Sequence, residues 1–278
     1  MQGVRRAICR LPACAFSRSL FVTRSCSLVL ALCVAPVLAQ DIQPFSTSKA
    51  DTLPAPWRLV GLPNGKAPLA QFDITTLGFD RVLRLATDKS YGTALHGLQP
   101  AVLAPGRKLK WRWRLEQALP LADLKLKAAD DAALKVCAMF DMPLDKLGFL
   151  ERNLVRLARS STGEKIPGAT LCYVWDHKLP VGSELPNAFS KRLRYIVLDS
   201  GEQKLGQWVN HERDLAADLQ RAFGHEFDTP PPLIAVVVGA DSDNTQGKSL
   251  AYLADVTFAG PAGAAGPASA ASAVKPTE

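Results

Sequence analysis

The 278-residue chain carries 33 basic and 26 acidic side chains, a formal net charge of +7. Five arginines and no acidic residue lie within the first 39 residues, so the rest of the chain keeps 28 basic and 26 acidic groups, about +2. This near balance excludes a nucleic-acid-binding protein, which needs a broad basic surface.

The first 39 residues have the pattern of a secretory signal peptide. A basic start is followed by the apolar run 27–34 and by the ending Val37-x-Ala39, where small residues suit cleavage. The apolar run is too short to form a stable membrane span. We therefore expect cleavage near Gln40, a periplasmic or secreted product, and no transmembrane span in the mature protein.

The six cysteines are divided between the leader and the rest of the chain. Four lie in the leader (Cys9, Cys14, Cys26 and Cys33), and bulky Leu32 before Cys33 argues against a lipoprotein signal. The other two, Cys137 and Cys172, fall in apolar, strand-like runs. An oxidising compartment permits a disulfide between them, but two buried free thiols suit such runs slightly better, and we expect no bridge.

Composition divides the remaining chain into three parts. Residues 40–55 are polar and Pro-bearing, and we expect a flexible segment. Residues 56–258 have the size of one ordinary domain. Residues 259–278 are almost all Ala, Gly, Pro and Ser, and we expect a disordered tail.

Short strands dominate the central part. They are rich in β-branched and aromatic residues and are separated by Gly, Pro, Asn or Asp. In the run 108–114, Lys108, Lys110, Arg112 and Arg114 alternate with Leu109, Trp111 and Trp113, which is typical of one half-buried strand. The pattern predicts a mainly β fold, a single jelly-roll sandwich, with strands at 57–60, 69–74, 81–86, 92–98, 108–115, 134–140, 170–175, 192–198, 207–209, 233–238 and 251–258.

Two helices are expected between these strands. Leucines at three- and four-residue spacing give 144–157 one apolar face. A second helix over 215–223 follows Asp214, a good N-cap, and stops at Gly224.

The order of motifs from Lys108 onward resembles a bacterial secreted family known as domain of unknown function 3047. The resemblance implies a galactose-binding-like jelly-roll sandwich and lends no catalytic residues, because none are established for the family. It rests on Trp111-Arg112-Trp113, Asp130-Asp131, Phe140-Asp141, Tyr173-Val174-Trp175, Ser200-Gly201-Glu202, Leu205-Gly206-Gln207-Trp208, Glu212-Arg213-Asp214, Asp218, Arg221-Ala222-Phe223-Gly224 and Asp241-x-Asp243-Asn244-Thr245.

One candidate metal site follows the most apolar strand. Asp241, Asp243 and Asn244 offer oxygen ligands of the kind that calcium prefers. A loop in which these side chains bond their own backbone explains the same residues without an ion. The four histidines show no spacing typical of zinc sites, and no G-x-S-x-G supports serine catalysis.

Asp130 and Asp131 are adjacent carboxylates just before a strand. Neighbouring strand residues point to opposite faces, so they do not form an acid/base dyad without a bend. We expect a turn in which one of them is ion-paired with Arg112 or Arg213.

The candidate ligand site combines aromatic and polar residues. Trp175 with Asp176, and Trp208 with the polar run after it, could line a saccharide cleft, since aromatic faces stack on sugars while polar groups bond hydroxyls; core tryptophans are the alternative. We predict one connected polar cluster made of Trp208, Arg213, Asp214 and Asp218 with Asp130 or Asp131.

Three functions remain open at this stage. The first is a non-catalytic binding module for a saccharide or another cell-envelope ligand. The second is a hydrolase of an envelope polysaccharide or ester that uses carboxylates from Asp130, Asp131, Asp214, Asp241 or Asp243 with His177 or His211. The third is a structural envelope protein. Convergence of these side chains on one open cleft distinguishes the first two from the third.

Overall fold

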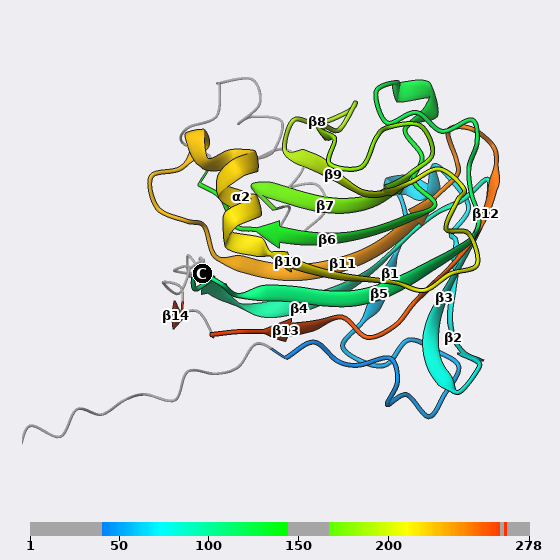
Figure 1. Ribbon diagram of the computed structural model, residues 1–278, viewed down its shortest axis with the longest axis horizontal. Coiled ribbons are helices and arrows are strands. Elements are labelled where there is room, and N and C mark those ends of the chain that lie inside the picture. The colour runs from blue at the N-terminus through cyan, green and yellow to red at the C-terminus, as the bar shows by residue number, and fades with distance from the viewer. Residues whose placement is uncertain (1–40, 144–166, 262–263, 266–278) are drawn as a thin grey trace, which may run out of the picture. The chain divides into compact units, whose positions relative to one another are not determined.

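The computed structural model describes residues 41–143, 167–261 and 264–265 (Figure 1). All of them belong to the larger of two compact units, Val37–Glu278. The leader and the leucine-faced helix expected at 144–157 lie outside the described residues. No helix within the described ranges is long and apolar enough to span a membrane.

Two β-sheets form a jelly-roll sandwich, which confirms the predicted fold class. The larger sheet has the order β1-β4-β11-β6-β7-β9-β8, with β14 beside β4, and the smaller sheet has the order β10-β5-β12-β3-β2, with β13 beside β5. All the pairs are antiparallel except β7 with β9. The strands are β1 (Arg58–Val60), β2 (Gln71–Leu77), β3 (Asp80–Asp88), β4 (Tyr91–Val102), β5 (Lys108–Gln117), β6 (Leu134–Phe140), β7 (Ala169–Asp176), β8 (Glu184–Pro186), β9 (Leu193–Ser200), β10 (Val209–Asp214), β11 (Leu233–Asp241), β12 (Lys248–Leu253), β13 (Thr257–Ala259) and β14 (Ala264–Ala265).

The helices are short. The α-helix α2 (Leu215–Phe223) has the predicted bounds, and Asp214 caps it by accepting a hydrogen bond from the Ala217 N–H at 3.0 Å. Leu215, Leu219 and Phe223 are its buried apolar residues. The described residues also form three 3-10 turns: η1 (Pro63–Gly65), η2 (Lys127–Ala129) and η3 (Gly224–Glu226).

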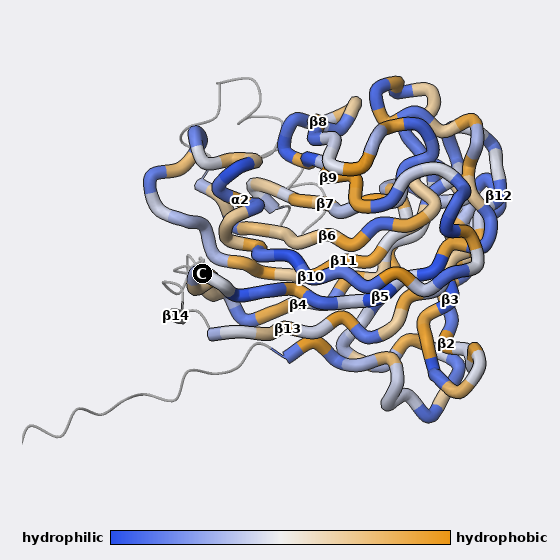
Figure 2. The backbone as a smooth tube through the Cα atoms, viewed as in Figure 1, coloured by the Kyte–Doolittle hydropathy of each residue, from blue (hydrophilic) through white to orange (hydrophobic). Residues whose placement is uncertain are grey.

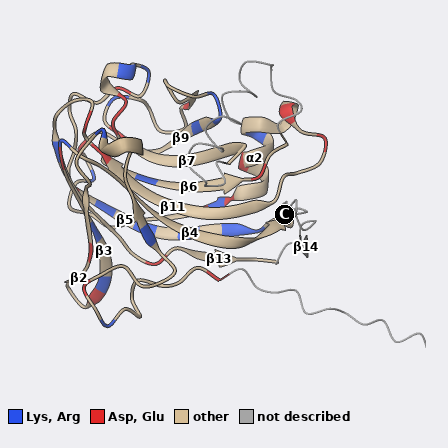
Figure 3. Ribbon diagram, turned by 180° about the vertical axis from the view of Figure 1, so that it is seen from behind, with Lys and Arg blue, Asp and Glu red and all other residues tan. Residues whose placement is uncertain are grey.

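The core lies between the two sheets, and alternation within the strands builds it. In β5, Leu109, Trp111, Trp113 and Leu115 are buried, whereas the charged residues between them are half-buried. Central strands of the larger sheet instead read as continuous apolar runs, because Leu124 and its neighbours cover their second face. Figure 2 shows the contrast between hydrophobic β11 and hydrophilic β10, and Figure 3 shows β7 and β11 largely without charged residues.

Cys137 and Cys172 form a disulfide, so the expectation of two free thiols is wrong. The residues stand directly opposite each other in the antiparallel pair β6–β7. Directly opposed residues bring their Cβ atoms close together, and this register is not visible in the spacing of the two cysteines along the chain.

The N-terminal segment that the sequence predicts to be flexible makes packed contacts with the sandwich in its described part, residues 41–55. Phe45 is fully buried and stacks on Trp57 with ring centres 4.9 Å apart. The Gln43 carbonyl accepts a hydrogen bond from the Trp57 indole at 2.7 Å, and the Gln43 N–H donates to His96 Nε2 at 3.0 Å. Two apolar side chains, Ile42 and Phe45, therefore anchor a segment whose average composition is polar. In the expected tail, Ala264 and Ala265 pair with β4.

Candidate binding groove

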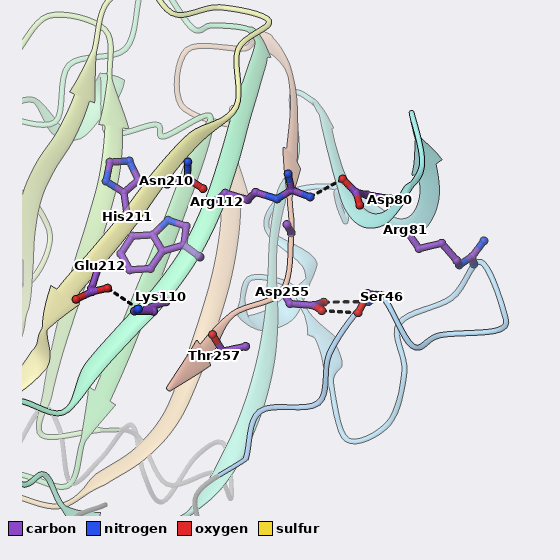
Figure 4. A pocket seen from close by; sticks show the side chains of 12 residues that line it. Ser46, Asp80, Arg81, Lys110, Arg112, Asn210, His211, Glu212, Asp255 and Thr257 are labelled. Atoms are coloured by element: carbon purple, nitrogen blue, oxygen red, sulfur yellow. Dashed lines mark hydrogen bonds and ion pairs between the residues drawn. The ribbon is translucent and has the colours of Figure 1, made fainter. Parts of the chain in front are cut away.

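A groove of about 550 Å³ lies against the smaller sheet, where β5 pairs with β10 (Figure 4). Its lining comes from β5, β10, the β2–β3 hairpin, the segment that follows β12 and the N-terminal segment. The lining residues are Ser46, Asp80, Arg81, Lys110, Trp111, Arg112, Asn210, His211, Glu212, Ala254, Asp255 and Thr257.

Strand register sets the floor of this groove. Lys110 stands opposite Glu212, and Arg112 stands opposite Asn210. Because β5 alternates as the sequence predicts, its basic side chains share the solvent face while Trp111 belongs to the core. The floor therefore presents charged and amide groups above a layer of aromatic rings.

The charged groups of the floor are paired. Glu212 accepts Lys108 Nζ at 2.5 Å and Lys110 Nζ at 2.6 Å, and these hydrogen bonds lower the pKa of the Glu212 carboxyl. Arg112 forms an ion pair with Asp80 of the β2–β3 hairpin and stacks on Trp208, with its guanidinium carbon 4.8 Å from the ring centre. Arg112 thus joins Trp208 to the hairpin.

Two loops wall the groove. The Ser46 N–H donates to Asp255 Oδ1 at 2.9 Å, which ties the N-terminal segment to the segment after β12. Arg81 donates to the Ala50 carbonyl at 2.8 Å and to Asp51 at 3.0 Å, which ties the hairpin to the same N-terminal segment. The segment expected to be flexible therefore forms part of the wall.

A fully buried carboxylate, Asp199, lies beneath this floor. It accepts hydrogen bonds from Trp113 Nε1 at 2.8 Å and from Lys204 Nζ at 2.7 Å, and its Oδ2 lies 2.7 Å from His211 Nε2. Burial alone would raise the pKa of Asp199, but these hydrogen bonds together lower it. Asp199 lies in β9 and His211 in β10, so the group links the two sheets. The sequence analysis missed Asp199, which has no local motif.

A second buried carboxylate, Asp218, confirms part of the predicted polar cluster. Arg213 donates to both of its oxygens at 2.9 and 2.7 Å, Tyr173 donates through its hydroxyl at 2.7 Å, and Arg221 lies 3.0 Å away. The other predicted members are not in this cluster. Asp214 caps α2, and Trp208 stacks on Arg112.

Asp130 and Asp131 do not join Arg112 or Arg213, so the predicted ion pair is wrong. Both carboxylates are buried, and their partners lie in neighbouring loops and in strand β9. Asp130 contacts Asn187 and Tyr195, and burial raises its pKa. Asp131 accepts the backbone N–H of Asn244 at 3.0 Å and that of Thr245 at 2.6 Å. A loop-closing role replaces the expected salt bridge because Arg112 and Arg213 are occupied elsewhere.

The candidate metal residues lie partly together. One oxygen each from Asp131, Asp241 and Asp243 lies within 4.8 Å of the others. Asp241 bonds the buried Lys135 ammonium at 2.9 Å and the Ala132 N–H at 2.9 Å; burial raises the pKa of Asp241 to about 6 against the attraction of Lys135. Asn244 donates to Asp131, so its side-chain nitrogen faces the cluster. The cluster thus contains a cation of its own, Lys135, which the sequence analysis missed.

Trp175 and Asp176 line only a small cavity of about 10 Å³, together with Asp131 and His177, and not the groove. Trp175 is buried and donates its indole N–H to the Gly201 carbonyl at 3.0 Å. Asp176 accepts the Lys178 N–H at 2.7 Å and so closes a turn. The core alternative for this tryptophan holds, because β7 is buried along its whole length.

Comparison with known proteins gives one family and several structures of the same general fold. The family model described as "Protein of unknown function (DUF3047)" matches residues 55–257. No curated protein matches the chain by sequence.

Three similar solved structures follow; each has a TM-score below 0.5, so no conclusion about this chain rests on them. A family 11 carbohydrate-binding module from Clostridium thermocellum has 8% identity and a TM-score of 0.37, over 81% of this chain and 96% of that one. A family 12 xyloglucanase from Bacillus licheniformis has 9% identity and a TM-score of 0.40, over 80% and 99%. Trichoderma harzianum endoglucanase 3 has 7% identity and a TM-score of 0.38, over 74% and 99%.

Proposed function

Because the chain belongs to the DUF3047 family, whose function is unknown, we propose a function from the groove itself. The protein is an exported, non-catalytic module that binds a saccharide chain across β5 and β10. The ligand residues expected from the sequence do not converge on this groove. The observation that carries the proposal is instead the composition of its floor. On the adjacent strands β5 and β10, N–H donors lie beside carboxylate and amide acceptors, because Lys110 is opposite Glu212 and Arg112 is opposite Asn210. Hydroxyl groups of a sugar can bond to both the donors and the acceptors.

Size and apolar surface support the same ligand class. A groove of about 550 Å³ falls within the range of pockets that bind small organic ligands. Trp111 supplies an aromatic ring to the lining, and Trp208, half-buried outside the lining, stacks on Arg112. Aromatic faces commonly pack on the C–H groups of other rings while the surrounding polar side chains fix orientation.

Binding is favoured over hydrolysis by the state of the carboxylates. A glycoside hydrolase of the usual kind needs one carboxyl group that remains protonated until it donates to the leaving group. In the groove, Glu212 has a lowered pKa and is bonded by two lysines. Among the described residues, the carboxyls with raised pKa values are Asp130, Asp241 and Asp243, and none of these three lines the groove.

Export is supported by two features of the chain. The leader has the composition of a signal peptide, and the Cys137–Cys172 disulfide is of a kind that persists in oxidising compartments. We expect N-terminal sequencing of the protein recovered from the producing cell to begin near Gln40. A chain that keeps its leader in the cytoplasm would contradict this part of the proposal.

The binding proposal is tested with an array of neutral and acidic oligosaccharides, followed by titration calorimetry. The double variant Asn210→Ala/Glu212→Gln should bind the preferred sugar about tenfold more weakly, since it removes the Asn210 amide and replaces the charged acceptor of Glu212 with a weaker neutral one. The control is Lys248→Ala, which breaks an exposed ion pair with Asp88 on the same sheet, outside the groove lining. Failure of the wild type to bind any sugar, or equal affinity of the double variant, would refute the proposal. Release of shorter sugars would favour the hydrolase alternative.

A further inference from the structure

Phe79 is completely exposed, at 106% of its reference surface, on the tip of the β2–β3 hairpin. An isolated exposed apolar residue is common on protein surfaces. This one is distinguished by its position, because the next two residues in the chain, Asp80 and Arg81, line the groove.

The hairpin turn does not explain the choice of phenylalanine. Leu77 pairs with Asp80, so the loop consists of Gly78 and Phe79 alone. Gly78 has a φ of +66°, whereas Phe79 has no positive φ. Two-residue hairpin loops with glycine at the first position leave the second position open to most residues. A small polar residue would therefore serve the turn and avoid exposing a ring to water.

The hairpin is held beside the groove by contacts of the first two residues of β3, which follow its tip. Asp80 reaches across to Arg112, as Figure 4 shows, and Arg81 bonds the N-terminal segment. The Arg112 guanidinium in turn stacks on Trp208. One chain of contacts thus links Trp208, through Arg112 and Asp80, to the residue next to Phe79.

The charge of the groove bears on the kind of sugar. Each basic residue that lines it contacts a carboxylate: Lys110 with Glu212, Arg112 with Asp80, and Arg81 with Asp51. An acidic sugar would have to compete with these carboxylates. A neutral sugar can bond to the paired groups through its hydroxyls without separating them.

We infer that Phe79 is a specificity-determining residue of the groove, an aromatic platform on which a ring of a neutral hexopyranose chain stacks at the groove mouth. The inference rests on the proposed function and goes beyond it by naming a ligand class and a contact residue. The hairpin sets the position of the ring, and the ligand supplies the apolar surface that Phe79 lacks in the free protein.

The experiment compares Phe79→Ala, Phe79→Leu and Phe79→Trp by titration calorimetry. The probes are cellohexaose, mannohexaose and hexagalacturonate. We expect tighter binding of a neutral probe than of hexagalacturonate, about fivefold weaker binding in the Ala and Leu variants, and retained affinity in the Trp variant. The fluorescence of the added tryptophan should shift to shorter wavelength when sugar binds. Leu126→Ala, at another exposed apolar position, is the control. All variants should unfold at the wild-type temperature.

The outcomes separate this inference from the proposed function. If the wild type binds no oligosaccharide, the proposed function fails and the inference fails with it. If the wild type binds and Asn210→Ala/Glu212→Gln weakens binding, but Phe79→Ala does not, only the role of Phe79 is refuted. Stronger binding of hexagalacturonate would refute the neutral ligand class. Vesicles of phosphatidylglycerol that bind the wild type and not Phe79→Ala, with sugar affinity unchanged, would assign Phe79 to a membrane surface instead.

Discussion

Arg213 of β10 and Asp218 of α2 form a two-point ion pair, with Nε 2.9 Å from Oδ2 and a terminal nitrogen 2.7 Å from Oδ1. The Asp218 side chain is 3% exposed and that of Arg213 is 28% exposed. We expect Arg213→Ala to lower the free energy of unfolding by about 3 kcal/mol, because a buried carboxylate loses its main partner while Tyr173 and Arg221 remain. Urea denaturation measures this change.

Arg221→Ala is the matched control for that prediction. Arg221 contacts the same carboxylate at 3.0 Å, but its side chain is 47% exposed. Exposed ion pairs contribute at most about 1 kcal/mol. Equal losses in the two variants would show that burial of Arg213 does not set the strength of the pair.

The disulfide gives a prediction about reducing conditions. Cys137 and Cys172 are 35 residues apart in sequence. Closing a loop of that length stabilises the folded state by about 3 to 4 kcal/mol, because it restricts the unfolded chain. We expect dithiothreitol to lower the urea midpoint of the wild type accordingly. The double variant Cys137→Ala/Cys172→Ala should be less stable and insensitive to the reductant; a reductant effect of equal size in that variant would contradict the explanation.

His96 gives a prediction about pH. Burial lowers the pKa of this histidine, partly offset by backbone hydrogen bonds, and its Nε2 accepts the Gln43 N–H at 3.0 Å. In the unfolded chain histidine has a pKa of about 6.5, so the unfolded chain binds the proton more readily than the folded protein does. The contribution of neutral His96 to the free energy of unfolding is therefore complete above about pH 6.5 and is lost as the pH falls below that value.

The measurement is Tm at pH 7.5 and pH 5.5. His96→Gln keeps an acceptor for Gln43 and does not titrate, so its Tm should fall less than that of the wild type. If both proteins lose the same number of degrees, other groups cause the pH dependence.

Lys135 gives a prediction about calcium. Its ammonium group lies against Asp241 in the acidic cluster, and both side chains are 7% exposed. We expect millimolar calcium to leave the Tm of the wild type unchanged, because Lys135 already supplies a positive charge there. Lys135→Met should cost about 3 to 5 kcal/mol by leaving a buried carboxylate unpaired.

The double variant Lys135→Met/Asp241→Leu tests the reason for that cost. It removes both charges and should recover part of the lost stability. A calcium-dependent rise in the Tm of the wild type would support the metal-site hypothesis and contradict this prediction.

Most strands of the sandwich could be predicted from the sequence because the alternation of apolar and polar residues lies within each strand. The alternation of Lys108 to Arg114 assigns one face of β5 to solvent and the other to the core, whatever the strand pairs with. The same holds for α2, whose cap and apolar spacing lie within one stretch of chain. The sequence predicts a strand at 207–209, whereas β10 runs from Val209 to Asp214. Its inward-facing residues include His211 and Arg213, so the usual apolar alternation is absent.

The sequence by itself therefore determined those elements in which side-chain type shows which face is exposed to solvent and which is buried. The partners of the buried charges were decided only by the tertiary structure. His211 meets Asp199, 12 residues away, and Asn244 meets Asp131, 113 residues away. The groove is likewise a product of strand pairing, since Ser46, Asp80, Arg112 and Glu212 become neighbours only when β5, β10 and the loops pack together. Hydrogen bonds and ion pairs act over a few ångströms of space, and distance along the chain does not encode them.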